Sequence, residues 1–407
     1  MHYETKKIWG IDCIFAPMQE GNSLTIEISV KAGSEYETRA EAGISHVLEH
    51  MFFKGWKQRA TPKAVATEMD KIGAEFNAAT GGSLTSYYVK CAPQFAQVSI
   101  ELLSDMMLGA QFATEELERE KGVIIQELKM YEDNPMSVVG EKWSSFFFWE
   151  NSYWRPTIGY EETIRSFTRE DLFAYKNALY TKDNILITIA GKIQDQAFLE
   201  KHIETLFSSL PAQKTRNKPE FKWQLPEKKS DFFVKGTEQN HVIIAMPGFT
   251  AFEEERYAAR VLTTILGGNM SSRLFQEIRE KLGLCYYIGA GHHASFEYWI
   301  FTIRSGLSKE NFAFWMQEIY RLLDIIVQEG ITQEEFENAK NYLKWSIQMG
   351  IESSNEMADF VSSQWLLHQK IQTLEDILDH YEAVSKEQVE AILPKLINDQ
   401  RRAFHIE

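Results

Sequence analysis

Apolar and polar residues follow two periods along this chain, and the change between them predicts its first elements. Residues 8–18 and 23–32 alternate in the manner of β-strands, and Ala32-Gly33-Ser34 ends the second of them. Residues 43–53 then follow a helical period. One stripe of this helix is apolar and consists of Ile44, Val47, Leu48 and Met51. We expect the helix to bury that stripe against a sheet.

The same two periods predict the elements that follow. In chain order these are a helix after Thr61-Pro62, strands over 74–79 and 85–91, helices over 94–110 and 114–130, and a buried strand over 184–191. Thr168 and Asp171 have the spacing of a capping box, which marks another helix start. The stretch 211–231 contains Pro211, Pro219, Pro226 and many lysines, so it predicts a linker.

The pattern restarts after this linker. Residues 241–248 form a strand pattern that ends in glycine, and residues 254–266 repeat the apolar spacing of the first helix. Residues 332–340 align with 113–121 without a gap. We therefore expect an α+β fold made of two duplicated domains, each a mostly antiparallel sheet covered by helices. The expected boundaries are 1–210 for the first domain, 211–231 for the linker and 232–407 for the second domain.

The composition agrees with two globular domains and argues against some classes of binding partner. The chain has 407 residues, of which 44% are hydrophobic and 25% charged, and this length exceeds one ordinary core. A net charge of -15 argues against nucleic acid and anionic membrane surfaces as partners. No apolar run approaches the roughly 20 residues that a membrane span needs. The three cysteines form neither a metal spacing nor a disulfide framework, so we expect a cytoplasmic protein.

The first helix carries the candidate chemistry on the side opposite its apolar stripe. His46 and His50 are four residues apart and share a face, and Glu49 lies beside them. Two neutral imidazoles at this spacing suit zinc, and a neighbouring carboxylate suits a general base for water. The order His-x-x-Glu-His inverts that of the better known His-Glu-x-x-His helix.

A zinc site of this kind needs a third protein ligand, and the internal repeat indicates where it lies. Glu120 and Glu127 are seven residues apart on the helix 114–130 and share one face. Their equivalents in the second half are Ala339 and Ser346, and that half also lacks the histidines. For each glutamate alone, a solvated helix face is the ordinary interpretation. Their joint loss from the half without histidines favours a metal site in the first half only.

These residues resemble the zinc signature of the inverzincins, a family that includes the pitrilysin, insulin-degrading and mitochondrial-processing peptidases. The resemblance covers essentially the whole chain. It implies that His46, His50 and Glu127 are the ligands of one Zn2+ per chain, and that Glu49 is the base. It also implies that Glu120 is a second acidic residue that supports activity, from behind the ligands.

The same resemblance implies substrate-binding residues in both halves. Phe76-Asn77-Ala78 looks like the edge strand on which the family lays its substrate, with Asn77 and Ala78 touching the peptide. The segment 271–286 resembles the one that supplies an arginine and a tyrosine. We assign these roles to Arg279 and Tyr286, with Arg273 and Tyr287 as rivals. The ordinary alternatives are a turn residue for Asn77, strand packing for Tyr286 and a surface charge for Arg279.

We therefore expect a zinc metalloendopeptidase that hydrolyses short unstructured peptides or leader segments, each bound as an added edge strand. The size resembles the short bacterial members, whose protomers pair as a clamshell, so we expect a homodimer. Two alternatives stay open: the catalytic subunit of an obligate heterodimeric peptide-maturation protease, and a non-catalytic structural homologue. Two positions depart from the family pattern, Gly81-Gly82-Ser83 and Trp56, and both predict an altered cleft shape.

Overall fold

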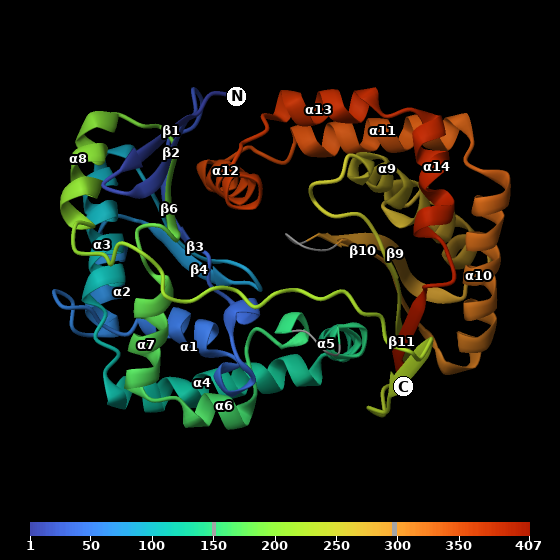
Figure 1. Ribbon diagram of the computed structural model, residues 1–407, viewed down its shortest axis with the longest axis horizontal. Helices are drawn as coiled ribbons and strands as arrows, with labels where there is room; N and C mark the ends of the chain where they lie inside the picture. The colour runs from blue at the N-terminus through green and yellow to red at the C-terminus, as the bar shows by residue number, and fades with distance from the viewer. Residues whose placement is uncertain (149–151, 295–298) are drawn as a thin grey trace. The chain divides into compact units, whose positions relative to one another are not determined.

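Two β-sheets, one in each of two units, organise the computed structural model of this protein (Figure 1). The structure describes residues 1–148, 152–294 and 299–407. The first unit comprises residues 1–130, 155–220 and 351–371, and the second comprises 131–154, 221–350 and 372–407. Each unit is thus assembled from segments that are far apart in the sequence.

The first sheet has the strand order β1-β2-β6-β3-β5-β4 within the described residues. Its strands are β1 (Glu4–Ile8), β2 (Ile11–Pro17), β3 (Leu24–Val30), β4 (Glu75–Thr80), β5 (Thr85–Cys91) and β6 (Ile185–Gly191). Neighbouring strands are antiparallel except for the parallel pair β2 and β6. β4 lies at one edge of this sheet.

The second sheet has the order β7-β11-β8-β10-β9 within the described residues. Its strands are β7 (Ser230–Phe233), β8 (Gln239–Pro247), β9 (Cys285–Ala294), β10 (Trp299–Ser308) and β11 (Arg402–Ile406). It too has one parallel pair, β7 with β11, among antiparallel neighbours. The predicted fold class, α+β with two mostly antiparallel sheets, is confirmed.

Helices supply the rest of both units. In the first half of the chain they are α1 (Ile44–Phe52), α2 (Pro62–Lys71), α3 (Ala96–Gly109), α4 (Thr114–Asp133), α5 (Pro135–Phe147), α6 (Glu161–Ser166), α7 (Arg169–Leu179) and α8 (Gln196–Leu206). In the second half they are α9 (Glu255–Gly267), α10 (Phe312–Glu329), α11 (Gln333–Gln348), α12 (Ser354–His368), α13 (Leu374–Ala383) and α14 (Lys386–Leu396). Thr168 and Asp171 form the predicted capping box at α7. Among the described residues, no helix is both long and apolar enough to cross a membrane.

Two helices belong to the opposite unit from the one their sequence position suggests. α5 follows α4, yet it packs on the second sheet, where Val139, Trp143 and Phe147 join a buried cluster with Ile243 and Phe404. α12 follows α11, yet it packs on the first sheet (Figure 1). The two helices follow equivalent long helices of the repeat, α4 and α11. The units defined by contacts therefore interleave in these segments, whereas the sequence boundaries 1–210 and 232–407 were drawn as continuous stretches.

The stretch 211–231 is divided between the two units. Lys218 forms an ion pair with Glu35 at 2.9 Å, and Arg216 forms one with Glu41 at 2.6 Å. These ion pairs join the first part of the stretch to the first unit. The chain passes to the second unit after Glu220, and β7 begins at Ser230. The predicted linker thus also supplies contacts to both units.

α12 covers a side of the first sheet that carries polar residues. Ile26 and Ile28 of β3 point into the main core of the unit, while Thr25, Glu27 and Ser29 alternate with them. These polar side chains are nevertheless buried. Ser354 of α12 hydrogen-bonds Thr25 at 2.8 Å, and Ser362 donates to Glu27 at 2.7 Å. The buried polar groups are thus paired with the helix that covers them, as buried polar groups require.

Candidate metal centre

α1 presents its two histidines on one face because its opposite face is fixed in the core. Ile44, Val47, Leu48 and Met51 are all buried, as the apolar stripe predicted. The His46 and His50 rings then lie side by side, with centroids 4.6 Å apart and an interplanar angle of 64°. Helix spacing and core burial together aim both imidazoles away from the sheet.

α4 brings Glu127 to the two histidines. Glu127 Oε2 lies 3.8 Å from His46 Nε2 and 3.5 Å from His50 Nε2. One ligand atom from each of the three residues lies within 4.8 Å of the others, and all three side chains are partly exposed. Among the residues that the structure describes, this is the cluster with metal-ligand chemistry. Glu127 therefore occupies the position predicted for the third ligand.

Glu120 lies behind His50, on the side away from Glu127. Its Oε1 accepts a hydrogen bond from His50 Nδ1 at 2.8 Å, and its Oε2 pairs with Lys54 Nζ at 2.7 Å. Burial opposes ionisation, but these two contacts outweigh it and lower the pKa of Glu120. Because an ionised carboxylate only accepts hydrogen bonds, His50 Nδ1 donates to Glu120, and Nε2 is the ring nitrogen that faces Glu127.

His46 has the protonation state that a metal ligand needs. Burial, followed by the neighbouring His50, lowers the pKa of His46 to about 4, so its imidazole is neutral at neutral pH. Two neutral imidazole nitrogens and one carboxylate oxygen are donors that zinc accepts, and three protein ligands leave a coordination position open. The residues present therefore fit a zinc ion.

Glu49 is held beside this cluster by β4. The Thr80 hydroxyl at the end of β4 donates a hydrogen bond to Glu49 Oε2. Burial raises the pKa of the Glu49 carboxyl, against the hydrogen bond from Thr80 and the nearby His50 ring. A carboxyl whose pKa moves toward neutrality suits proton transfer in both directions. The geometry thus agrees with the predicted base.

Comparison with known proteins decides the family. Residues 16–160 match the family described as Insulinase (Peptidase family M16), and residues 166–343 match the Peptidase M16 inactive domain. An uncharacterized zinc protease of Bacillus subtilis is 34% identical, over 93% of this chain and 91% of its own length. One from Rickettsia bellii is 33% identical, over 91% and 89%. The chain belongs to the M16 peptidase family.

Solved structures share the M16 fold at low identity. The crystal structure of a protease from Helicobacter pylori has a TM-score of 0.90 at 20% identity and covers 100% of this chain and 99% of its own. A Pseudomonas fluorescens structure described as a peptidase M16 inactive domain has a TM-score of 0.90 at 19% identity, covering 100% and 98%. These likenesses extend the M16 architecture to the whole chain.

The edge strand β4 carries the two predicted substrate residues of the first half. Asn77 and Ala78 lie on β4, which pairs with β5 alone in the sheet order. Asn77 Oδ1 accepts a hydrogen bond from the Ala78 N–H at 2.9 Å. The Asn77 side chain thus contacts the backbone of its own strand. The peptide-binding role of both residues stays a prediction.

The two predicted substrate residues of the M16 inactive domain contact each other. Arg279 Nε donates to the Tyr286 carbonyl oxygen at 2.9 Å, and the Tyr286 side chain is 78% exposed. Their rivals have internal partners: Arg273 pairs with Glu335, and the Tyr287 hydroxyl lies 3.0 Å from His241 Nδ1. The exposed ring of Tyr286 is available to a substrate, whereas Arg279 also pairs with Glu280 at 3.2 Å. The role of both residues stays a prediction.

The sequence reasoning missed three residues that support the cluster. Lys54 is four residues after His50 and two beyond the end of α1, a spacing that could have been recognised. Thr80 is a neighbour of Glu49 only in space, and Glu37 reaches α1 through its side chain. Trp56 was expected to alter the cleft shape, and this stays a prediction. Its ring is fully buried and its indole N–H donates to the Phe52 carbonyl at the end of α1.

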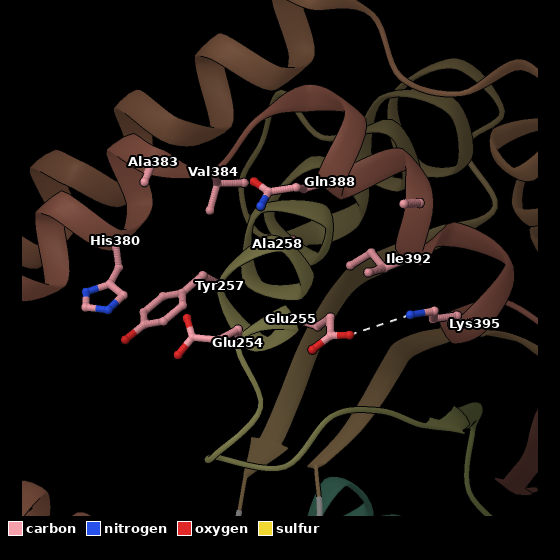
Figure 2. Close-up of a pocket in the computed structure, with 11 residues that line it drawn as sticks. Glu254, Glu255, Tyr257, Ala258, His380, Ala383, Val384, Gln388, Ile392 and Lys395 are labelled. Carbon is pink, nitrogen blue, oxygen red and sulfur yellow. Dashed lines mark ion pairs between the residues drawn. The ribbon is translucent and has the colours of Figure 1, made fainter.

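The second unit contains a cavity of about 490 Å³ beside α9, α13 and α14 (Figure 2). Tyr257 stacks on His380 with ring centroids 4.6 Å apart, and Glu255 pairs with Lys395 at 3.5 Å. In Figure 2 these side chains spread along the cavity wall rather than converging on one point. The metal-type cluster of the described residues lies in the first unit, so this cavity is not the candidate centre.

Proposed function

We propose that this protein is a zinc-dependent endopeptidase that cleaves short unstructured peptides or leader segments. The observation that carries the proposal is the convergence of His46 Nε2, His50 Nε2 and Glu127 Oε2 beside the Glu49 carboxylate. The curated relatives are named zinc proteases, which supports the same reaction class.

One Zn2+ per chain, held by His46, His50 and Glu127, would supply a Lewis acid that activates water and polarises the scissile carbonyl. Glu49 takes the proton of the attacking water and passes it to the leaving amine. Thr80 restricts rotation of that carboxylate through its hydrogen bond. Glu120 fixes the ring orientation and tautomer of His50.

The substrate adds a strand to the first sheet at β4. An edge strand offers unpaired backbone groups, and an extended peptide can satisfy them regardless of its sequence. Arg279 and the exposed Tyr286 supply further substrate contacts from the inactive domain. In this proposal the active assembly is a homodimer, which the native mass of the purified protein tests.

The test of the reaction compares wild type, Glu49→Gln and Glu115→Gln. Glu115 is an exposed glutamate of α4 and serves as the control for loss of one carboxylate. Zinc content and cleavage of an internally quenched peptide are measured on each protein. Glu49→Gln should retain zinc and lose turnover by about 100- to 10,000-fold, because only the proton transfer is removed. A fully active Glu49→Gln protein, or a wild type that binds no zinc, would contradict the proposal.

A further inference from the structure

The metal-binding helix α1 has no side-chain cap of its own. Its N-cap residue is Gly43, with φ 94°, which offers no oxygen to the first amides of the helix. The first N–H groups of any helix lack partners within the helix, and short helices fray from such ends. His46 lies in this first turn. The position of one ligand therefore depends on what holds the start of α1.

Glu37 supplies the missing cap from outside the helix. Its Oε2 accepts a hydrogen bond from the Gly43 N–H at 2.8 Å, and its Oε1 accepts one from the Ser45 N–H at 2.9 Å. The side chain is 0% exposed. Burial raises the pKa of Glu37 to about 7, against the hydrogen bonds from Ser45 and Gly43, and above that pH its carboxylate also meets the positive end of the helix dipole. Both oxygens of one buried carboxylate are thus committed to the first turn of α1.

The surroundings fix Glu37 and the start of the helix together. Arg155 Nη1 donates to the Glu37 carbonyl oxygen at 2.5 Å, which anchors its backbone. The Ser45 hydroxyl lies 2.8 Å from the Tyr175 hydroxyl. A Cβ atom at Gly43 would come within 2.5 Å of the Ile158 carbonyl oxygen, so the backbone is closely packed there. These contacts together hold the first turn of α1 in the conformation observed.

This arrangement matters to metal binding because the ligands come from both ends of α1. His46 follows Ser45 directly, whereas His50 lies in the last turn and is held by Glu120. Metal–ligand distances tolerate deviations of about 0.2 Å, so a frayed first turn would remove His46 from the ligand set. His46 Nδ1 is buried and has no hydrogen-bond partner among the described residues, so that ring is not oriented through its second nitrogen. Its orientation therefore depends on the backbone that carries it.

We propose that Glu37 is a positioning residue of the metal centre, which fixes the first turn of α1 and thereby holds His46 in reach of an ion shared with His50 and Glu127. The inference rests on the proposed zinc site. It assigns to Glu37 no contact with metal or substrate.

The test measures metal affinity in Glu37→Gln and Glu37→Ala, with Glu35→Gln as the matched control. Glu35 is a second buried glutamate of the same segment, but it pairs with Lys218 at 2.9 Å and with Ser83. Zn2+ affinity is measured by competition with a chromophoric chelator, and the visible spectrum of the Co2+ form reports the number of ligands. Urea unfolding of the metal-free proteins gives their stability.

We expect affinity to fall in the order wild type, Gln, Ala, with a loss of about 10-fold or more for Ala. The Gln side chain keeps one oxygen that can accept from a backbone N–H group, but its NH2 group faces the other backbone N–H. The loss of affinity for Gln should therefore lie between those of wild type and Ala. The Co2+ spectrum of both Glu37 variants should change, while Glu35→Gln should lose stability and keep its affinity and spectrum. The isosteric Gln variant carries the test if the Ala variant does not fold.

Wild-type affinity in both Glu37 variants would overturn the inference, as would an equal loss of affinity in Glu35→Gln. A wild type that binds neither Zn2+ nor Co2+ would overturn it together with the proposed function. Because the readout is metal affinity, absence of peptide cleavage counts against the proposed function alone.

Discussion

Glu120→Gln removes one negative charge from behind His50 and leaves the size of the side chain unchanged. The carboxylate is nearly buried, and it accepts from His50 Nδ1 at 2.8 Å while pairing with Lys54 at 2.7 Å. The amide can still accept one hydrogen bond through its oxygen, but that bond is neutral. The substitution therefore weakens the hold on His50 without opening a cavity.

The magnitude follows from the type of bond that is lost. A hydrogen bond to a charged group contributes about 1.5–3 kcal/mol, and a neutral acceptor retains roughly half of this. Zinc affinity should thus fall by about 0.75–1.5 kcal/mol, which is roughly 3- to 12-fold. Loss of a partner behind a metal-bound histidine typically costs about 10- to 100-fold in affinity or activity, so the two arguments overlap.

Chelator competition on metal-free protein at neutral pH measures this loss, with Glu115→Gln as the control on the same helix. Glu127→Gln provides the scale for removal of a direct ligand and should lose far more affinity. Equal affinity of Glu120→Gln and wild type would refute the role of Glu120 behind His50. A loss as large as that of Glu127→Gln would show that Glu120 is itself a ligand.

Three further predictions concern stability. Burial raises the pKa of Glu27, against hydrogen bonds from Ser29 and Ser362. The protonated side chain therefore stabilises the folded state fully below about pH 4.5, and this contribution to the free energy of unfolding is lost as the pH rises through the raised pKa. Thermal unfolding across pH should show this fall in wild type and not in Glu27→Gln; parallel curves would contradict it. Gly43→Ala should lower the free energy of unfolding measured in urea by about 1–3 kcal/mol, because Gly43 has φ 94° and an added Cβ would meet neighbouring backbone atoms. The control Gly73→Ala should cost less, since Gly73 has φ 59° and open space around it. Trp56→Phe should cost about 1–3 kcal/mol by the same measurement, since it removes the donor to Phe52; unchanged stability would mean that this bond contributes nothing.

Much of the candidate site could be predicted because its chemistry is local or repeated. His46, His50 and Glu49 lie within one helix, where spacing alone sets the shared face. Glu127 lies on another helix, and its absence from the second half of the repeat indicated it. The distances that bring Glu127 to the two histidines and place Glu120 behind His50 came only from the structure.

Capping by Glu37 left no comparable pattern in the sequence. A usual N-cap is a short polar residue at the helix start, and α1 has glycine there. Glu37 reaches the helix because the intervening residues fold back, and the sequence contains no periodic sign of that turn. The same holds for Thr80, which meets Glu49 only after β4 is placed beside α1.

The sequence by itself determined the periodicity of the elements, the duplication and the face of α1 that carries both histidines. Only the tertiary structure decided which helix covers which sheet. Alternation along β3 is typical of a strand with one solvated side, yet α12 buries Thr25, Glu27 and Ser29. The hydrophobic period of a segment shows which of its sides is apolar, and residues close in the sequence are enough to set it. What covers the polar side of β3 is a different question, because Ser362 bonds Glu27 from 335 positions away. Contacts over that distance depend on the whole fold.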